Sequence, residues 1–419
     1  MNLAYTDFAC CALTDVSSDA SYLISASNTF SDTDLSGLST LDLSTTVFAT
    51  SEMTAGDGNV YTASLTFAQA NLSGLSTLDL STTVFATSGM TTGDGDVSTA
   101  DYTFNYADLS GLSTLDLSTT VFTASGMTDG GSVYTGCYTF NCVDLSGLPT
   151  LDLSTTVFAT SKMTTGNGGV YTADYTFNYA DLSGLSTLDL STTVFTAFEM
   201  TTGDGDIYTA NGTFNYADLS GLSTLDLSTT VFTAFEMTTG DGDIYTANGT
   251  FYSTDLSRLT TLDLSTTVFA TSEMTAGDGE VYTAYYTFSY TNLRKLLTLD
   301  LSTTVFATSE MTAGDGNVYT AGGTFYAVDL SGLSTLDLST TVFAASGMIT
   351  GDGDIYTAYY TFCEANPRKL LTLDLSTTVF ATSEMTTGNG AVYTADYTFP
   401  MCNLVQMNNI YLPSTQPDS

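Results

Sequence analysis

One eight-residue stretch, LDLSTTVF, first occurs at residues 41–48 and is found ten times without change in this chain of 419 residues. Its first leucine recurs every 37 residues, with one step of 36, at positions 41, 78, 115, 151, 188, 225, 262, 299, 336 and 373. A fixed period of this length is typical of stacked supersecondary units, which bury their apolar faces only against one another. The repeat therefore predicts one elongated domain rather than several globular ones.

The repeat divides the chain into three predicted parts. Residues 1–29 are expected to form an N-terminal cap or degenerate half-repeat, residues 30–398 ten tandem repeats, and residues 399–419 a degenerate last repeat and tail. Terminal units lack a neighbour on one side, so their sequences are expected to differ. The one shortened step falls in the turn after Met127, which indicates a surface loop.

Apolar and polar residues alternate within each unit as they do in β-strands. Residues 114–118 read Thr-Leu-Asp-Leu-Ser, which predicts a short strand with its leucines in the core. A second β-prone run covers residues 121–127. A third, such as residues 207–210, follows a Gly-Asp-Gly turn that favours a hairpin or a corner.

No stretch has the apolar spacing of a helix, so the predicted fold class is all-β. We expect an elongated solenoid of about ten to eleven stacked 37-residue coils. Methionines recur at the same period and are predicted to fill the core rather than to bind metal. They stand at positions 53, 90, 127, 163, 200, 237, 274, 311, 348 and 385.

The charge restricts the classes of partner. Six Lys and Arg oppose 45 Asp and Glu, which gives a net charge of −39. A chain so poor in cations cannot neutralise phosphates, so nucleic acid and anionic membranes are poor partners and no nucleic-acid partner is predicted. Cationic partners and divalent metal ions fit better. No run of 18 apolar residues occurs, so no transmembrane segment is predicted.

The N-terminus and the cysteines give little evidence of secretion, zinc binding or disulfide bonds. Residues 1–15 lack the basic segment of a signal peptide, so no convincing one is recognised. The six cysteines, at positions 10, 11, 137, 142, 363 and 402, do not recur at the period. They show neither zinc spacing nor a readable disulfide framework.

The aspartate of LDLS is the main candidate binding residue, because stacking would align its copies on the exposed strand face. The candidate residues are Thr40, Asp42, Ser44, Asp79, Asp116, Asp152, Asp189, Asp226, Asp263, Asp300, Asp337 and Asp374. Neighbouring carboxylates about 5 Å apart repel by roughly 1 kcal/mol in water. Either cations, calcium among them, bridge this ladder, or the side chains are solvated and discourage edge-to-edge aggregation.

The Gly-Asp-Gly turns hold a second set of acids, including Asp94, Asp96, Asp204 and Asp206. Calcium is the cofactor that they would bind, and no other cofactor is predicted. Asparagine replaces the turn aspartate at positions 167 and 389, which favours an ordinary turn requirement for Asp or Asn beside Gly.

No catalytic constellation is visible. The chain has no histidine, and each candidate Asp or Ser is present in about ten equivalent copies. An active site needs one asymmetric constellation, so we expect a protein that is not an enzyme. Tyr106, Tyr179 and Tyr216 are placed either to stack on sugars or to pack against the protein.

The segment L-x-x-L-x-L-x-x-T-x-F resembles the leading half of a leucine-rich repeat, with Thr at the usual Asn or Cys position. In one copy these residues are Leu75, Leu78, Leu80, Thr83 and Phe85. The frame also resembles the BspA-type surface antigens, whose units carry F-x-x-C-x-L, as Phe399, Cys402 and Leu404 do. The resemblance implies a leucine-rich-repeat-like solenoid with an extracellular, adhesive and non-enzymatic role.

These observations lead to three hypotheses. The first is a cell-surface or extracellular adhesin-like protein that binds a protein or glycan partner through its Thr/Asp/Ser strand face. The others are a structural surface or filament spacer without a specific ligand, with self-association open, and a calcium-stabilised β-roll array. Positions that differ between copies cluster after the Val-Phe pair, at residues 52, 89, 162 and 198, and before the next leucine.

Overall fold

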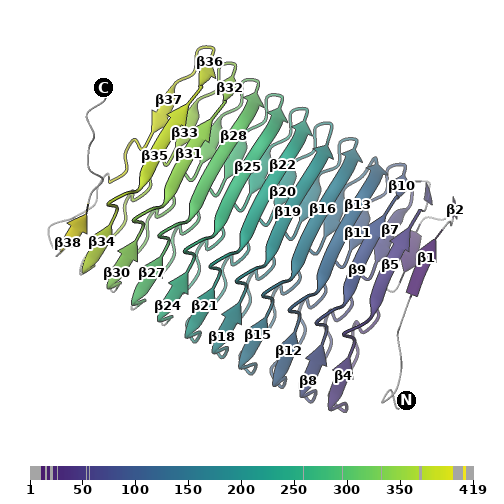
Figure 1. Cartoon of the computed structure of the whole chain (residues 1–419). Helices are drawn as coiled ribbons and strands as arrows, with labels where there is room; N and C mark the ends of the chain where they lie inside the picture. The colour runs from purple at the N-terminus through teal and green to yellow at the C-terminus, as the bar shows by residue number, and fades with distance from the viewer. Residues whose placement is uncertain are drawn as a thin grey trace.

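The computed structural model describes residues 11–14, 17–18, 22–25, 27–399 and 409–411, except for residues 53, 56, 258, 295, 332, 368 and 369. The described chain winds into a parallel β-solenoid, whose coils contribute strands to three sheets that run along the stack (Figure 1). Every helix or strand in these residues is a β-strand. The predicted all-β stack of coils roughly 37 residues apart is therefore confirmed.

The first sheet, here called the LD sheet, contains the ten Thr-Leu-Asp triplets of the repeated motif and one further strand near the C-terminus. Each triplet pairs in parallel with its equivalents, so that Leu115 lies between Leu78 and Leu151. Its 11 strands are β4 (Thr40–Asp42), β8 (Thr77–Asp79), β12 (Thr114–Asp116), β15 (Thr150–Asp152), β18 (Thr187–Asp189), β21 (Thr224–Asp226), β24 (Thr261–Asp263), β27 (Thr298–Asp300), β30 (Thr335–Asp337), β34 (Thr372–Asp374) and β38 (Asn409–Tyr411).

The second sheet, the VF sheet, begins in each coil at the Val-Phe pair. Its main strands are β1 (Cys11–Thr14), β5 (Val47–Ser51), β9 (Val84–Ser88), β13 (Val121–Asp129), β16 (Val157–Thr165), β19 (Val194–Thr201), β22 (Val231–Thr239), β25 (Val268–Ala276), β28 (Val305–Ala313), β31 (Val342–Ser346) and β35 (Val379–Ser383). Where the long strand is divided, a short second part follows. These parts are β2 (Ser17–Ser18), β6 (Thr54–Ala55), β10 (Thr91–Thr92), β32 (Ile349–Thr350) and β36 (Thr386–Thr387).

The third sheet, the YT sheet, follows the glycine turn. Its 11 strands are β3 (Tyr22–Ser25), β7 (Asn59–Thr62), β11 (Val97–Thr99), β14 (Val133–Thr135), β17 (Val170–Thr172), β20 (Ile207–Thr209), β23 (Ile244–Thr246), β26 (Val281–Thr283), β29 (Val318–Thr320), β33 (Ile355–Thr357) and β37 (Val392–Thr394). The runs on the two sides of the turn thus join different sheets, and each pairs in parallel with neighbouring coils. The turn is a corner and not a hairpin.

The two ends of the chain continue the stack where they are described. Strands β1 and β3 pair with the first full coil, and β38 pairs with β34. Residues 1–10, 15–16, 19–21, 26, 400–408 and 412–419, which include Cys10 and Cys402, lie outside the described residues.

Leucines and two columns of phenylalanine form the larger core. The leucines of the LD sheet face inward, as predicted, and Leu78 and Leu80 are fully buried. Phenylalanines in successive coils stack with nearly parallel rings; the Phe195 and Phe232 centroids are 4.9 Å apart and their planes differ by 1°. Such pairs add about 0.5–1.5 kcal/mol beyond the burial of their surface.

The smaller core lies between the VF and YT sheets and contains the methionine column. Met200 and Ile207 are both fully buried in it. Eight of the ten methionines are buried, Met385 at the last coil is partly buried, and Met53 lies outside the described residues. The predicted core-filling role is confirmed for the methionines that the structure describes.

A column of buried threonines connects each coil to the preceding one. Thr83 Oγ1 donates to the carbonyl of Leu43 at 2.7 Å, and Thr120 Oγ1 donates to that of Leu80 at 2.6 Å. Both side chains are fully buried. The hydroxyl therefore satisfies a carbonyl of the preceding coil that no water reaches.

Candidate binding surfaces

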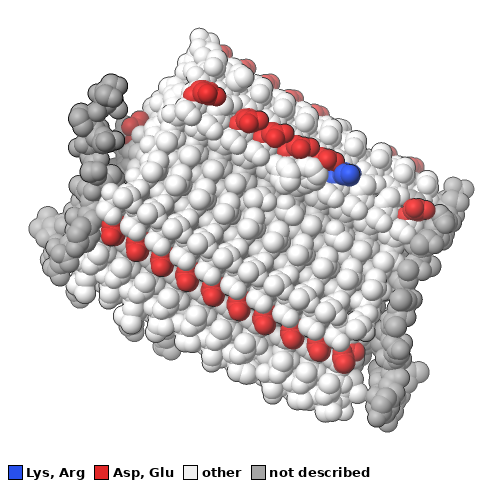
Figure 2. All heavy atoms as spheres, viewed as in Figure 1, with Lys and Arg blue, Asp and Glu red and all other residues white. Residues whose placement is uncertain are grey.

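The aspartates of the LD sheet form one continuous row along the solenoid, the lower row of acidic side chains in Figure 2. Parallel pairing holds each residue directly beside its equivalents, as with Asp152 and Asp189. Adjacent strands are about 4.8 Å apart, so the row repeats a negative charge at that spacing. The structure thus brings the ten predicted aspartates together on one face.

Each of these side chains has the same local hydrogen bond. The Oδ1 atom accepts the backbone N–H of the serine two residues later, at 2.8 Å for Asp189 and Ser191 and at 3.0 Å for Asp42 and Ser44. This contact closes the turn that follows the strand and fixes the direction of the carboxylate. The second oxygen of each side chain remains available on a partly exposed surface.

The predicted hydroxyl residues lie beside this row. Thr40 is exposed on the same strand as Asp42 and pairs with Thr77 in the next coil. Ser44 Oγ donates to Asp42 Oδ1 at 2.7 Å. The hydrogen bonds from the Ser44 side chain and backbone lower the pKa of Asp42, so this end of the row is ionised at neutral pH.

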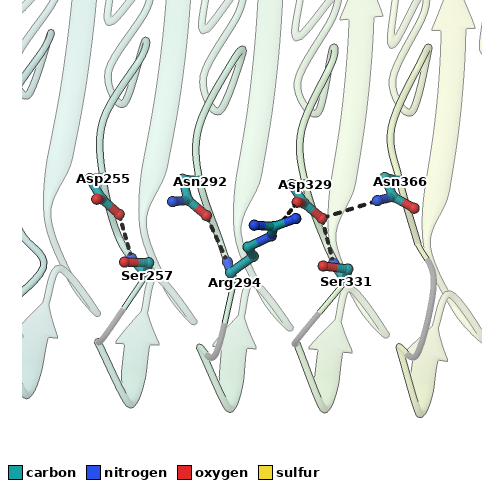
Figure 3. A network of polar contacts seen from close by, with 7 residues as sticks. All are labelled: Asp255, Ser257, Asn292, Arg294, Asp329, Ser331 and Asn366. Atoms are coloured by element: carbon teal, nitrogen blue, oxygen red, sulfur yellow. Dashed lines mark hydrogen bonds and ion pairs between the residues drawn. The ribbon is translucent and has the colours of Figure 1, made fainter.

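A second ladder, which we call the Asx ladder, makes the same type of contact. It consists of Asp34, Asn71, Asp108, Asp144, Asp181, Asp218, Asp255, Asn292, Asp329 and Asn366, joined by parallel bridges. Figure 3 shows four of its members, and Asp255 and Asn292 each accept the backbone N–H two residues later. Asparagine therefore replaces aspartate here without loss of the turn.

Arg294 stands at a repeat position that serine holds in most coils, and it contacts the next coil. Its Nε lies 2.6 Å from Asp329 Oδ2 in the next coil, and Asn366 donates to Asp329 Oδ1 (Figure 3). Partial burial by itself would raise the pKa of Asp329, but the Ser331 hydrogen bonds and the guanidinium outweigh it and lower that pKa. Lys295, Arg368 and Lys369 lie outside the described residues.

The acids of the glycine turns serve as structural caps. Asp206 Oδ1 accepts the Asp243 N–H at 2.8 Å, and Asp96 Oδ1 accepts the Ser132 N–H at 2.8 Å. Asp94 and Asp204 are exposed at the corner. Among the residues that the structure describes, no group of three or more acidic or cysteine side chains lies close enough to hold a metal ion.

A row of glutamates crosses the VF sheet at one of the positions that vary between copies. Glu199 and Glu236 have φ values of 54° and 56°, and glycine takes the same left-handed conformation at Gly89 and Gly126. Lys162 precedes the four adjacent glutamates, as the upper row of Figure 2 shows. The variation thus falls on a strained backbone position between the two parts of the sheet.

The YT sheet carries a tyrosine ladder that the sequence analysis did not identify. In the Val-Tyr-Thr strands inside the stack, such as β17 and β26, the valine and threonine are buried and the tyrosine faces outward. Tyr134 and Tyr171 stack with centroids 4.8 Å apart, and the ladder continues through Tyr208 and Tyr245. The alternation in each triplet was the available signal, because period two separates buried from exposed side chains.

The tyrosines that were singled out from the sequence lie outside this ladder. Tyr106, Tyr179 and Tyr216 are 60%, 57% and 46% exposed, so packing inside the protein does not account for them. Tyr179 and Tyr216 stack on each other at 5.0 Å.

Comparison with known proteins gives no family. No protein family matches the sequence, and no curated protein matches it. Among solved structures, the fold is similar to PfbA, a surface adhesin of Streptococcus pneumoniae, at 6% identity and a TM-score of 0.20, over 86% of this chain and 84% of that one.

A second similar structure is the leucine-rich-repeat ectodomain of the Arabidopsis thaliana receptor kinase GASSHO1/SCHENGEN3. The identity is 10% and the TM-score 0.07, over 87% of this chain and 68% of that one. Both TM-scores are far below 0.5, so neither likeness carries an argument about function.

The described part of the chain contains no helix that is long and apolar enough to cross a bilayer.

Proposed function

We propose that this chain is a non-enzymatic, adhesin-like rod at a cell surface or in the extracellular space. It binds a protein or glycan partner through the repeated Thr/Asp/Ser face of the LD sheet. The observation that carries this proposal is the unbroken row of ten aspartates in register on that face. A repeated chemical group on a rigid support is suited to multivalent binding.

The comparison between the two ladders indicates that the charge itself matters on the LD sheet. Both ladders use one side-chain oxygen to accept the backbone N–H two residues later. Asparagine stands at three of the ten positions of the Asx ladder, and Asn71 and Asn292 perform that role. The LD sheet has aspartate at all ten copies of the motif, although the turn requires no charge. Aligned carboxylates repel one another, so a cationic partner would relieve a cost that solvent only screens.

The affinity of such a face would come from the number of contacts. A single exposed ion pair contributes about 0–1 kcal/mol, which is too little for stable binding. Ten equivalent sites on one stiff stack act together, because the first contact raises the effective concentration of the others. A partner with cationic groups at a regular spacing therefore fits this face best.

The resemblance of the repeat to BspA-type surface antigens supports the proposed location and adhesive role. The absence of histidine and the multiplicity of every candidate nucleophile support a role without catalysis. A spacer without a ligand is the competing function, and the row of unpaired acids is the observation that speaks against it.

Two matched variants test the proposal. One variant carries Asn at seven LD-sheet aspartates: residues 116, 152, 189, 226, 263, 300 and 337. The control carries Asn at the seven aspartates of the Asx ladder: residues 34, 108, 144, 181, 218, 255 and 329. Asn keeps the cap at every position, so both variants lose the same charge and retain the turns. Binding to immobilised poly-L-lysine and to chitosan is measured for both.

We expect the LD-sheet variant to lose more than about tenfold in affinity, since each lost contact weakens multivalent binding. The control variant should lose less affinity, because only its lower net negative charge weakens binding. Equal losses in the two variants would mean that binding depends on overall charge alone, and the proposed face would be abandoned. A parent protein that binds neither polymer would favour the spacer.

A further inference from the structure

The tyrosine ladder of the YT sheet has one gap. Ser98 occupies the position that tyrosine holds in the coils on both sides, and it pairs in register with Tyr61 and Tyr134. Those two tyrosines are two coils apart, about 10 Å along the stack. The missing ring therefore leaves a space between two aromatic side chains.

A cavity of about 390 Å³ opens at this gap. Three tyrosines of the ladder and two that follow the YT strands, Tyr102 and Tyr138, line its walls. Asp101, Cys137 and Asp174 line it from three successive coils. The carboxylates are 5% and 4% exposed, so both are almost completely removed from solvent. In the other described coils this column holds Ser, Asn, Tyr, Gly or Asp, so the lining changes along the solenoid.

The two carboxyl groups are incompletely satisfied. The Oδ1 atoms of Asp101 and Asp174 are buried and have no hydrogen-bond partner in the described structure. Burial raises the pKa of Asp101 well above its usual range and that of Asp174 to about 8. A buried acid without a counter-ion is costly, and such groups are retained where they bind something.

We propose that this cavity is a binding site for an organic ammonium group, held by the carboxylate of Asp101 and by the faces of the flanking tyrosines. Carboxylate and tyrosine together form the environment that ammonium ions prefer, because the ring faces are electron-rich and the acid supplies the opposite charge. The net charge of −39 attracts cations to the site and disfavours anions.

Binding should release a proton. Burial favours the protonated form of Asp101, and an ammonium ion that replaces the acidic proton would send it to the buffer. The other titratable groups that face Asp101 are Asp174, Cys137, Tyr102 and Tyr134. Burial raises the pKa of the Cys137 thiol and of Tyr102 and Tyr134, so these three stay neutral at pH 7.

Calorimetric titration of the full chain with n-butylammonium chloride at pH 7 tests the site. Neutral n-butanol and glucose are the comparison probes, and two buffers of different ionisation heat report proton release. Nα-acetyl-lysine methylamide separates the two sources of the group. Tighter binding than butylammonium would indicate a lysine side chain of a partner, and weaker binding a free amine.

Three variants accompany the titration. Asp101→Asn removes the charge without changing the shape, and Ser98→Tyr completes the ladder with the residue of the neighbouring coils. Asp108→Asn makes an equal charge change in the Asx ladder, outside both the LD sheet and the cavity. We expect Asp101→Asn to weaken butylammonium binding by about tenfold or more, since the ammonium group loses its charged partner. Ser98→Tyr should abolish binding, and Asp108→Asn should leave it nearly unchanged.

Thermal unfolding confirms that each variant folds, and Ser98→Tyr remains a complete test if Asp101→Asn does not. The proposal fails if butylammonium does not bind, or if butanol or glucose binds as tightly. It also fails if the Ser98→Tyr variant binds butylammonium with the same affinity as the parent protein. A heat of binding that is the same in both buffers would also contradict it.

Discussion

Thr172 Oγ1 donates a hydrogen bond to Thr160 Oγ1 at 2.5 Å inside the smaller core, joining the YT sheet to the VF sheet. The same pair, 12 residues apart, occurs between Thr99 and Thr87 at 2.6 Å. In the next coil, Ala197 lies at the position of Thr160, and Thr209 lies at the position of Thr172. Because alanine has no hydroxyl, the buried Thr209 hydroxyl has no hydrogen-bond partner in the described structure. The unpaired hydroxyl is therefore a consequence of one substitution across the core.

Ala197→Thr should raise the stability of the array. The new hydroxyl would meet Thr209 Oγ1, and a satisfied buried hydrogen bond contributes about 1 kcal/mol. The midpoint of urea unfolding measures the change. Ala197→Val is the matched control, because valine has the shape of threonine without its hydroxyl. If valine stabilises the protein as much as threonine, filled space and not the hydrogen bond is the cause.

Asp174→Asn should make stability less dependent on pH. The folded state holds the Asp174 proton up to a pKa of about 8, whereas the ordinary pKa of an aspartate side chain is 3.8. Between these values unfolding releases a proton, so the free energy of unfolding falls as pH rises from about 4 to about 8 and then levels. Relative to the parent, the Asn variant should be more stable at pH 9 and nearly equal at pH 4.

Thermal midpoints across this pH range test the Asp174 prediction. Asp152→Asn makes the same change on the LD sheet of the same coil and should keep the parent's pH profile. A parent midpoint that rises between pH 5 and pH 8 would contradict the sign of the prediction, although Asp101 shares the cavity and acts in the same direction.

Phe195→Ala should destabilise the middle of the stack by about 3–5 kcal/mol, as expected for a large buried aromatic side chain. Phe195 is fully buried and stacks on Phe158 and Phe232, at 5.1 and 4.9 Å. Phe380 holds the same repeat position in the last coil, where it is only partly buried. Phe380→Ala should therefore lower the free energy of unfolding much less, as measured by chemical denaturation. Equal losses in the two variants would show that stacking against two neighbouring rings does not stabilise the phenylalanine column.

Calcium should leave the thermal midpoint unchanged when far-ultraviolet circular dichroism is recorded with millimolar calcium and with a chelator. Calcium requires six to eight oxygen ligands, whereas each coil offers one LD-sheet carboxylate with one oxygen already occupied by serine. A large rise of the midpoint with calcium would instead identify the acidic rows as metal sites. The calcium-stabilised array would then replace the present proposal.

The sequence by itself determined the period, the strand content and the inward side of the strands. LDLSTTVF recurs at a fixed step, and alternation in Thr-Leu-Asp assigns Leu78 to the core and Asp79 to the surface. Both inferences rest on local pattern, because a strand has a side-chain period of two and a solenoid aligns equivalent residues. The aspartate row and the methionine column followed from the same rule.

Only the tertiary structure decided which residues meet between coils and across the core. The glycine turn became a corner because its flanking runs pair with other coils. The contact of Thr172 with Thr160 and the cavity beside Ser98 depend on how three sheets face one another. The spacing of residues along the sequence predicts neither feature. Asp101, for example, differs from an ordinary surface aspartate only because it is buried. Burial is a property of the packed stack and not of the 37-residue unit.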